Sequence, residues 1–457
     1  MQAVEEKYEF SASAKKNVFI TFGVGLVLTI LGALFGGSSH HEGHGDAHAS
    51  HVQTNDHKDH GAHMEEKKHD EHAVDHGSHD SHEGGMLARI KANLWLNNIF
   101  FAGLGIIGLF FVAIQYAAQA GWSAGIKRIP LAMGSWIPVA GILTLALFFF
   151  VKGTVFHWTH TDLYHAGTDH FDSIINGKKG YFFWPLSEHP SFPVFYIARM
   201  IVFFGLWYLF FVWIKKEILK EDLETGTASW FKIRKLSAIF LVIFAFTSSI
   251  GAWDWVMSID THWFSTMFGW YLFASWWVSG LALITLIVVL LKDKGYLSIV
   301  NANHLHDLGK FVFAFSIFWT YIWFSQFMLI YYANIPEETV YYYERWIGSE
   351  HYSPYFFLNL IINFAFPFLV LMTRDAKRHS RFLKVVCPVI IFGHWLDFYL
   401  MIMPGTLKNG SGFGFLEVGM ILVFLSAFLY VVLSSLSKVP LVAKNHPMLE
   451  ESLHHHI

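Results

Sequence analysis

GAWDWVMSIDTHWFSTMFGWY, residues 251–271, closes one apolar run of the chain and opens the next. Such a stretch predicts a short turn between two membrane-spanning helices. Asp254 stands at the end of the first run, between Trp253 and Trp255. A carboxylate at the edge of a membrane span is unfavourable unless it has a partner or contacts water. We therefore expect this region to take part in function.

The composition indicates that the whole chain is a membrane protein. Of its 457 residues, 54% are hydrophobic and 18% are aromatic, and the mean hydropathy is +0.39. Soluble proteins of this length are far less apolar. About twenty apolar residues cross a bilayer, and ten runs of that length predict an all-α polytopic membrane protein with ten transmembrane helices. The expected spans cover roughly residues 17–36, 94–118, 131–152, 193–215, 236–256, 266–291, 310–333, 354–373, 383–403 and 413–436.

The distribution of lysine and arginine predicts the orientation of these spans. One set of loops, together with both termini, carries 21 of these residues, and the other set of loops carries 10. Positive residues are enriched on the cytoplasmic side, so the N-terminus (1–16) and the C-terminal segment (437–457) are predicted to be cytoplasmic. The net charge of −3 and the short basic clusters between spans give no basis for nucleic-acid binding.

A weak internal repeat suggests two four-helix bundles. WDWVM at 253–257 and WLDFYLM at 395–401 each place an acid between aromatic residues, with methionine close behind. Spans two to five (94–256) and six to nine (266–403) then form two related bundles. The first span (17–36) and the tenth (413–436) are expected to be peripheral helices.

The connection between the first two spans, residues 37–93, is rich in histidine. Residues 38–84 contain thirteen histidines, from His40 to His82, and eleven Asp or Glu residues. A segment with so few apolar residues cannot form a core, so we expect a disordered loop on the outer, periplasmic side. Imidazoles and carboxylates in such numbers can bind divalent transition metals. The irregular spacing instead favours a solvated insertion with adventitious metal affinity.

Two other outer loops are aromatic rather than acidic. Residues 152–192 contain five histidines among many Trp, Tyr and Phe residues, and residues 334–353 have a similar character. Aromatic loops of this kind lie at the membrane interface or contact a partner. We expect both loops to be ordered and to serve in docking.

The chain has few ionisable groups in or at the edge of its spans. They are Arg199, Asp254, His394, Asp397 and Glu417, with His304, His306, Asp307 and Lys310 at the entry to span seven. Intramembrane ionisable groups are most often functional, commonly as proton relays. His394 and Asp397 are three residues apart, so they share one helical face.

These groups have more than one interpretation. The set from His304 to Lys310 is either a cytoplasmic proton-collecting mouth or a solvated helix start. Arg199 could pair with a nearby carboxylate and simply lock two helices together. We expect Asp254, His394, Asp397, the His304 to Asp307 group, Glu417 and Arg199 to line a proton path.

The sequence restricts the cofactors that the chain can hold. Cys387 is its single cysteine, which excludes an internal disulfide, thiolate-held iron–sulfur clusters and a CxxCH haem attachment. A bis-histidine haem needs two deep histidines, and only His394 lies deep in a span. A quinone head group needs one or two hydrogen-bonding groups in an aromatic cleft. The candidates for that role are Trp253, Asp254, Trp255 and His394, so quinone or quinol, with lipid, are the candidate ligands, and no covalently bound cofactor is expected.

Two longer stretches resemble a known family. Residues 251–277, GAWDWVMSIDTHWFSTMFGWYLFASWW, and residues 306–339, HDLGKFVFAFSIFWTYIWFSQFMLIYYANIPEET, are similar to the ActF-type subunits of bacterial alternative complex III. Those subunits belong to the NrfD/PsrC-like membrane protein family. The resemblance extends over about half of the chain and is most specific over 251–345, and the His-rich loop lies outside the family pattern.

The resemblance implies a subunit of a quinol:cytochrome c (or other acceptor) oxidoreductase in the bacterial inner membrane. It implies ten helices in two four-helix bundles with two peripheral helices. The implied partners are a homologous NrfD-like membrane subunit, a periplasmic iron–sulfur subunit and c-type cytochrome subunits, with a terminal oxidase as an optional further partner. In such complexes the sister subunit is the main site of quinol oxidation, and the ActF-type subunit is proposed to offer a proton path.

Four functions follow as hypotheses. The favoured one is a membrane subunit that carries no redox centre and lines a proton path. The second is a quinone-binding subunit of the same complex, and the third is a metal-ion transporter supplied by the His-rich loop. The fourth is a structural scaffold in which every buried charge belongs to a helix-locking pair.

Overall fold

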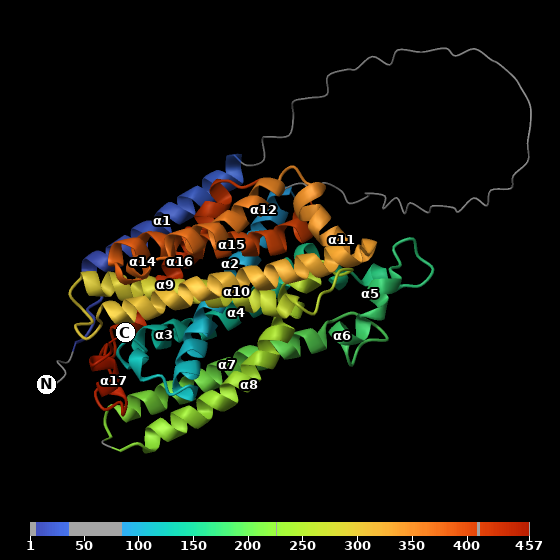
Figure 1. The fold of residues 1–457 in the computed structure, drawn as a ribbon. Helices are drawn as coiled ribbons and strands as arrows, with labels where there is room; N and C mark the ends of the chain where they lie inside the picture. The colour runs from blue at the N-terminus through green and yellow to red at the C-terminus, as the bar shows by residue number, and fades with distance from the viewer. Residues whose placement is uncertain (1–5, 36–84, 225, 409–411, 457) are drawn as a thin grey trace, which may run out of the picture.

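The computed structural model describes residues 6–35, 85–224, 226–408 and 412–456. Within these residues there is no β-strand, and ten helical stretches are long and apolar enough to cross a membrane. The prediction of an all-α polytopic membrane protein is therefore confirmed. Figure 1 shows these helices running side by side along the long axis of the molecule.

The ten spans match the predicted runs closely. They are α1 (Ala12–Phe35), α2 (Gly85–Ala117), α3 to α4 (Arg128–Val155), α7 (Val194–Glu221), α8 with a 3-10 turn (Ala228–Ile259), α9 (Phe268–Asp293), α10 (Ala302–Ala333), α12 to α13 (Ser353–Val370), α15 (Ser380–Leu407) and α16 (Phe415–Leu436). Shorter helices in the connections are α5 (Ser173–Gly177), α6 (Lys179–Phe183), α11 (Pro336–Tyr342), α14 (Arg374–Arg378) and α17 (Leu449–Leu453).

Several helices begin well before their apolar runs. α10 starts at Ala302 rather than near residue 310, because Asn301 caps it by accepting hydrogen bonds from the backbone N–H groups of Asn303 and His304. α8 likewise starts at Ala228 and α2 at Gly85. A window of apolar residues finds the part of a helix that lies in lipid, and polar turns extend the helix beyond that part.

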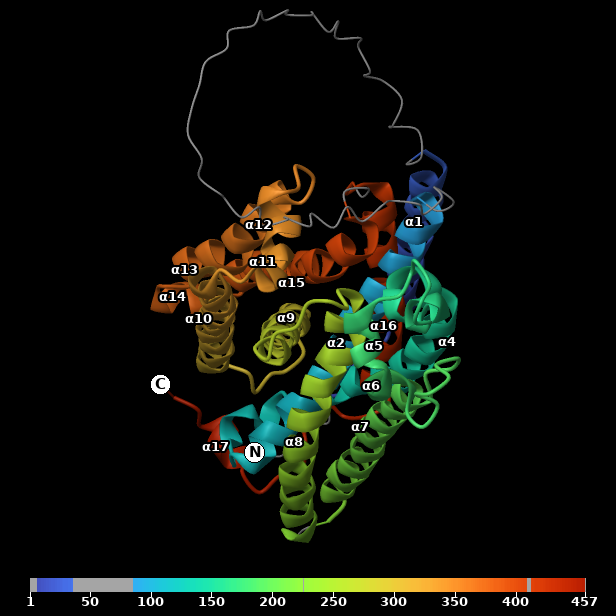
Figure 2. The same ribbon diagram turned by 90° about the vertical axis from the view of Figure 1, so that its right-hand side faces the viewer.

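The spans pack as two bundles with two helices outside them. α2, α4, α7 and α8 pack around one another, and α9 packs with α10 and α15, which α12 and α13 complete (Figure 2). α2 and α9 are buried over 89% of their apolar windows, whereas α1 is buried over only 11% of its window. α16 lies against α2, and α1 lies against α16. The bundles meet where α2 and α8 pack on α9 and where α15 packs on α2, and α1 and α16 are peripheral.

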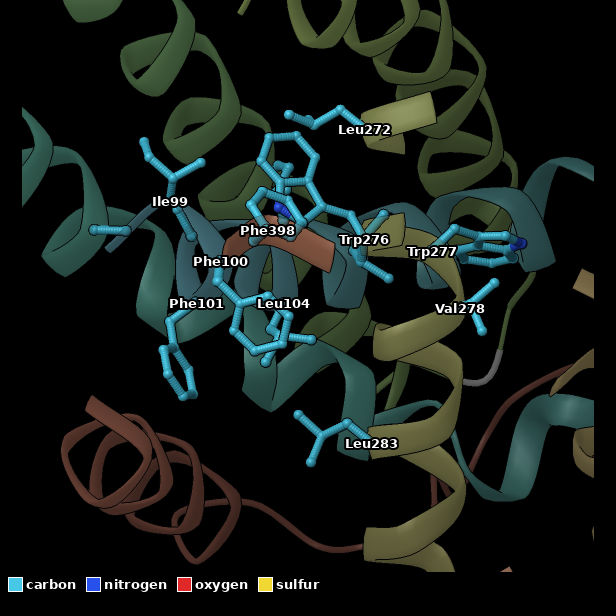
Figure 3. Packing of buried hydrophobic residues seen from close by; sticks show 14 of the residues in the cluster. Ile99, Phe100, Phe101, Leu104, Leu272, Trp276, Trp277, Val278, Leu283 and Phe398 are labelled. Carbon is cyan, nitrogen blue, oxygen red and sulfur yellow. The ribbon is translucent and has the colours of Figure 1, made fainter. Parts of the chain in front are cut away.

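The centre of the molecule is aromatic. Trp276 of α9 stacks on Phe398 of α15, with ring centroids 6.1 Å apart, and Phe100 of α2 meets the same ring edge-on at 5.6 Å (Figure 3). Gly103 of α2 faces the indole of Trp276 so closely that any Cβ would overlap it. This close contact explains why a glycine occupies an otherwise bulky apolar helix.

Both ends of the described chain lie together. Lys7 pairs with Pro440, and the backbone N–H of Leu441 donates to the carbonyl of Glu6. We call this side of the molecule the terminal end, and the side that carries α5, α6 and α11 the opposite end (Figure 1). The segment 440–456, here called the tail, covers part of the terminal end.

Candidate functional site

Asp397 lies in the interior of the second bundle, on α15, with no exposed surface. Its carboxylate accepts hydrogen bonds from four neutral groups. The donors are the Tyr271 hydroxyl, the Ser275 hydroxyl at 2.7 Å, the Trp319 indole at 2.9 Å and the Asn359 amide at 2.9 Å. These donors come from α9, α10 and α12, so every helix of the bundle contributes to the site. Within the described residues, no basic side chain forms an ion pair with Asp397.

His394 belongs to the same site. Ser275 Oγ lies 3.0 Å from His394 Nδ1 and 2.7 Å from Asp397 Oδ2, so one hydroxyl joins the imidazole to the carboxylate. The Trp319 ring meets the imidazole edge-on, with centroids 5.5 Å apart. His394 Nε2 is buried and has no hydrogen-bond partner among the described residues. The structure thus brings together the two residues that helical spacing paired.

A local irregularity places Asn359 against the site. α12 (Ser353–Leu360) continues into a π-helical turn, Ile361–Ala365, before α13. Such turns shift the side chains that follow them and often mark functional sites. Asn363 in this turn donates to Asn359 Oδ1 at 2.6 Å, which leaves the Asn359 amide N–H group directed at Asp397. Gly393 allows the turn to approach α15 closely, because a Cβ at that position would overlap Asn363.

Asp254 has a different environment in the first bundle. Arg199 of α7 holds it through two hydrogen bonds, Nε to Oδ2 at 2.7 Å and Nη2 to Oδ1 at 2.9 Å. Nη1 of Arg199 donates to the carbonyl of Tyr181, and the guanidinium lies 4.1 Å from the centroid of the Tyr181 ring. This bidentate pair joins α7, α8 and α6. It has the geometry of the helix-locking pair that the sequence left as an alternative for Arg199.

Glu417 is likewise paired. It accepts two hydrogen bonds from Arg89 of α2, one of them 2.7 Å long, and a third from Asn93 at 3.1 Å. The second carboxylate oxygen of Glu417 also accepts the backbone N–H of Gly414, which caps α16. These contacts fasten the start of α16 to the start of α2 at the opposite end. Glu417 therefore belongs to a separate site from Asp397, where it holds two helices together.

The His304 to Lys310 group lies at the terminal end, where the tail covers it. His304 Nε2 is 3.0 Å from the Ser452 hydroxyl, and His455 Nε2 is 2.6 Å from Asp307 Oδ2. Lys310 also pairs with Asp307, at 2.5 Å. His306 is buried, and its Nδ1 atom has no hydrogen-bond partner among the described residues. The structure therefore brings the predicted mouth together with a segment that sequence reasoning did not connect to it.

The two aromatic loops, residues 152–192 and 334–353, form an ordered cap at the opposite end. Trp158 stacks on Phe182 at 4.0 Å within the first loop, and its indole donates to the Ser258 hydroxyl at 3.4 Å. Tyr341 of the second loop stacks on Trp263 at 4.0 Å, so both loops pack on the turn after α8. His262 in this turn contacts Asp172 at 2.5 Å. Although burial opposes it, hydrogen bonds from the Ile175 N–H and His262 hold the pKa of Asp172 below its usual value. The expected order of these loops agrees with this packing, and their docking role stays a prediction.

The quinone candidates are divided between the bundles. Trp253, Asp254 and Trp255 belong to α8, and Trp255 packs against Phe204 and Trp207 of the first bundle. His394 instead contacts α9 and α10 of the second bundle. The residues from His40 to His82 lie outside the described residues, and within the described part no cluster of three or more His, Cys, Asp or Glu side chains is arranged to hold a metal ion.

Sequence reasoning missed most partners of Asp397. Tyr271, Ser275, Trp319 and Asn359 were not selected, because aromatic and small polar residues are common in this chain. A usable signal exists in α9, where Tyr271 and Ser275 are four residues apart and so share a face. Arg89 was also missed, since it lies before the apolar run of α2.

No protein-family model matches this chain, and no curated protein matches it. The family resemblance of residues 251–277 and 306–339 therefore remains a prediction. The geometry around Asp397 bears only on what the second bundle can do chemically.

Proposed function

We propose that this chain is a membrane subunit of a quinol:cytochrome c (or other acceptor) oxidoreductase complex, and that its second bundle carries protons through Asp397. It holds no redox centre itself in this proposal. The observation that carries the proton role is that Asp397 is fully buried among neutral donors, with no cationic partner in the part of the chain that the structure describes. Membership of the complex is supported by the sequence resemblance alone.

The chemistry of the site suits proton transfer. A carboxylate that is held by an arginine must break an ion pair before it can bind a proton, and that costs several kcal/mol in a buried setting. Asp397 has no such pair to break. The hydroxyls of Tyr271 and Ser275 can each donate one hydrogen bond and accept another. Ser275 therefore offers a continuous hydrogen-bonded connection from Asp397 to His394, whose free Nε2 atom can continue the path.

The same comparison narrows the set of proton-carrying residues. Asp254 and Glu417 each have an arginine in bidentate contact, so we assign them to structure. Asp397 and His394 are the residues that we assign to the path. The proposed setting is the bacterial inner membrane, with both termini cytoplasmic and with a sister NrfD-like subunit, an iron–sulfur subunit and c-type cytochromes as partners.

The test begins with the native assembly. The protein is purified from its own membranes, and the preparation is assayed for c-type haem, iron–sulfur clusters and quinol oxidation. We expect all three to copurify with it. A preparation that lacks haem and quinol activity would overturn the assignment to the complex, and quinone found bound at Trp253 and Trp255 would instead favour the quinone-binding alternative.

The proton role is tested with Asp397→Asn, which keeps the shape of the side chain. We expect turnover in the assembled complex to fall by about 100-fold or more, since blocked proton transfer commonly has effects of that size. Asp254→Asn is the matched control, because it alters a buried acid of the first bundle. Unchanged turnover and unchanged proton release per electron in Asp397→Asn would disprove the path.

A further inference from the structure

A second group of buried charged residues lies at the terminal end of the first bundle. Lys127 and Arg128 stand at the start of α3, and Glu221 and Asp222 at the end of α7. Lys127, Arg128 and Glu221 are 3%, 1% and 0% exposed. The tail closes the cluster from outside with His446, which is 5% exposed. None of the roles considered so far uses this cluster.

The cluster is closely connected. Tyr116 of α2 donates to Glu221 Oε2 at 2.9 Å, and Lys127 Nζ lies over the Tyr116 ring, 4.0 Å from its centroid. Arg128 Nη2 contacts Asp222 Oδ2, and Lys127 Nζ contacts His446 Nε2. Groups from α2, α3, α7 and the tail therefore meet in one place.

Four polar atoms of the cluster are buried and lack hydrogen-bond partners among the described residues. They are Nε and Nη1 of Arg128, Oε1 of Glu221 and Oδ1 of Asp222. Buried charged groups are almost always hydrogen-bonded, and internal water is the usual partner where protein atoms are missing. Two donors and two acceptors in one cluster are the groups that bind such water.

The contacts of His446 indicate whether Lys127 is charged or neutral. Nδ1 of His446 accepts the backbone N–H of Met448 at 3.1 Å, so in the neutral imidazole the hydrogen is on Nε2. That N–H group is directed at Lys127 Nζ. An ammonium has only donors, whereas a neutral amine has a lone pair that can accept. The geometry therefore favours a neutral Lys127 in this arrangement of the tail.

The charges around Lys127 agree with this assignment. Burial lowers the pKa of Lys127 from 10.5 to about 7, the carboxylates of Glu221 and Asp222 oppose that change, and Arg128 reinforces it. Burial also lowers the pKa of His446 to about 3, with Lys127 and Arg128 adding to the effect. The remaining group that faces Lys127 is the phenol of Tyr116.

We propose that Lys127 and Glu221, with water held by Arg128 and Asp222, form a second proton-exchange site, and that His446 of the tail is its gate. Proton uptake forms an N–H bond at Lys127 Nζ and breaks an O–H bond of a protonated cavity water. The charged amine can no longer accept from His446, so the tail loosens at this point. In the next step an N–H bond of Lys127 breaks, the proton crosses the cavity water, and an O–H bond forms at Oε1 of Glu221, which leaves Lys127 neutral again. That this site is the uptake end of the Asp397 proton path rests on the proposed function. Proton exchange between Lys127 and Glu221 does not depend on it.

The first test is direct and needs no catalytic activity. Infrared difference spectra of the purified protein are recorded between about pH 6 and about pH 8, the range around the Lys127 titration. We expect a carboxyl signal that is lost in Glu221→Gln and shifted in Lys127→Met. Glu217→Gln is the matched control, because Glu217 lies one turn earlier on α7 and pairs with Lys232 at 2.5 Å. Spectra of Glu221→Gln that coincide with those of the wild type would overturn the proposal.

A second measurement uses only the wild-type protein, so it still tests the proposal if the variants fold poorly. An experimental map of the wild-type protein at a resolution that shows ordered water should contain water against Arg128 Nη1 and Glu221 Oε1. Direct protein contacts at both atoms would overturn the hydrated site. If Asp397→Asn leaves turnover unchanged while the Glu221 signal persists, the proposed path fails and the exchange site stands.

Discussion

The two bundles treat a buried aspartate in opposite ways. In each bundle the fourth helix carries the acid, and a side chain of the third helix donates hydrogen bonds to it. In the first bundle Arg199 of α7 donates to Asp254 of α8. In the second bundle Asn359 of α12 donates to Asp397 of α15. The arginine supplies a full positive charge in a bidentate pair, and the asparagine supplies one neutral N–H group. The same position in the helix order thus holds an ion pair in one bundle and a carboxylate that only neutral groups contact, among the described residues, in the other.

The depth of the two acids fits this division. The α-helical part of α8 is Ala228–Trp255, so Asp254 is its next-to-last residue, near the connection to α9. Arg199, which holds Asp254, also donates to the carbonyl of Tyr181 there. Asp397 lies well inside α15 and accepts hydrogen bonds from three other helices, α9, α10 and α12. A strong pair at the end of a bundle fixes its helices, and a neutral cage in the interior leaves a group that can change its charge.

The largest expected effect comes from breaking the ion pair. Arg199→Leu leaves the carboxylate of Asp254 buried without a counter-charge, which should lower the free energy of unfolding by about 3–5 kcal/mol. Thermal unfolding of the purified protein measures the loss. The double variant Arg199→Leu with Asp254→Asn removes both charges and should recover most of it. Equal stability of the single and double variants would show that the pair has no locking role.

The next prediction concerns Asn359, the neutral donor to Asp397 that stands where Arg199 stands in the first bundle. Asn359→Leu removes a hydrogen bond to a buried acid and should reduce turnover about tenfold, corresponding to about 1–3 kcal/mol. Asn98→Leu is the matched control, because Asn98 is equally buried and donates to Thr144 at 2.7 Å within the first bundle. We expect the control to lose similar stability and to keep its turnover. Similar turnover in both variants would contradict the difference between the bundles.

The tail offers a pH-dependent comparison, since His446 contacts the first bundle and His455 the second. The folded pKa of His446 is about 3 against an ordinary 6.5, so the folded protein keeps this histidine neutral. Its contribution to stability is complete above pH 6.5 and is lost as the pH falls toward 3. At about pH 5 the loss should reach about 2 kcal/mol.

Unfolding temperatures of the wild type and His446→Leu, measured from about pH 7 to about pH 5, test this contribution. The variant should lose less stability on acidification. His379→Leu is the control, because the side chain of His379 is exposed. An acid dependence that is the same in all three proteins would rule out His446 as the source.

The smallest effect concerns the hydroxyl between His394 and Asp397. Ser275→Ala removes that connection and should lower turnover by several-fold, corresponding to about 1 kcal/mol. Ser279→Ala is the matched control, because Ser279 lies one turn along α9 and donates only to backbone carbonyls. If both variants behave alike, the Ser275 hydroxyl is a packing group and not part of the path.

Much of the architecture could be predicted from local sequence. Ten apolar runs gave ten spans, and the echo between 253–257 and 395–401 indicated the two bundles. The pairing of His394 with Asp397 also followed from spacing within one helix. The helix starts at Ala302 and Ala228 were less accessible, since polar helical turns leave no hydropathy signal.

The sequence by itself determined which residues lie in the membrane and which acids lie among them, because the length of an apolar run and the period of a helix are local properties. It also showed that the stretch 251–271 joins two spans and contains an acid that needs a partner. Only the tertiary structure decided that this partner is Arg199, and that Asp397 has no arginine or lysine partner among the residues that the structure describes. The reason is that a counter-charge is a neighbour in space, supplied by a helix whose distance along the chain carries no information about contact.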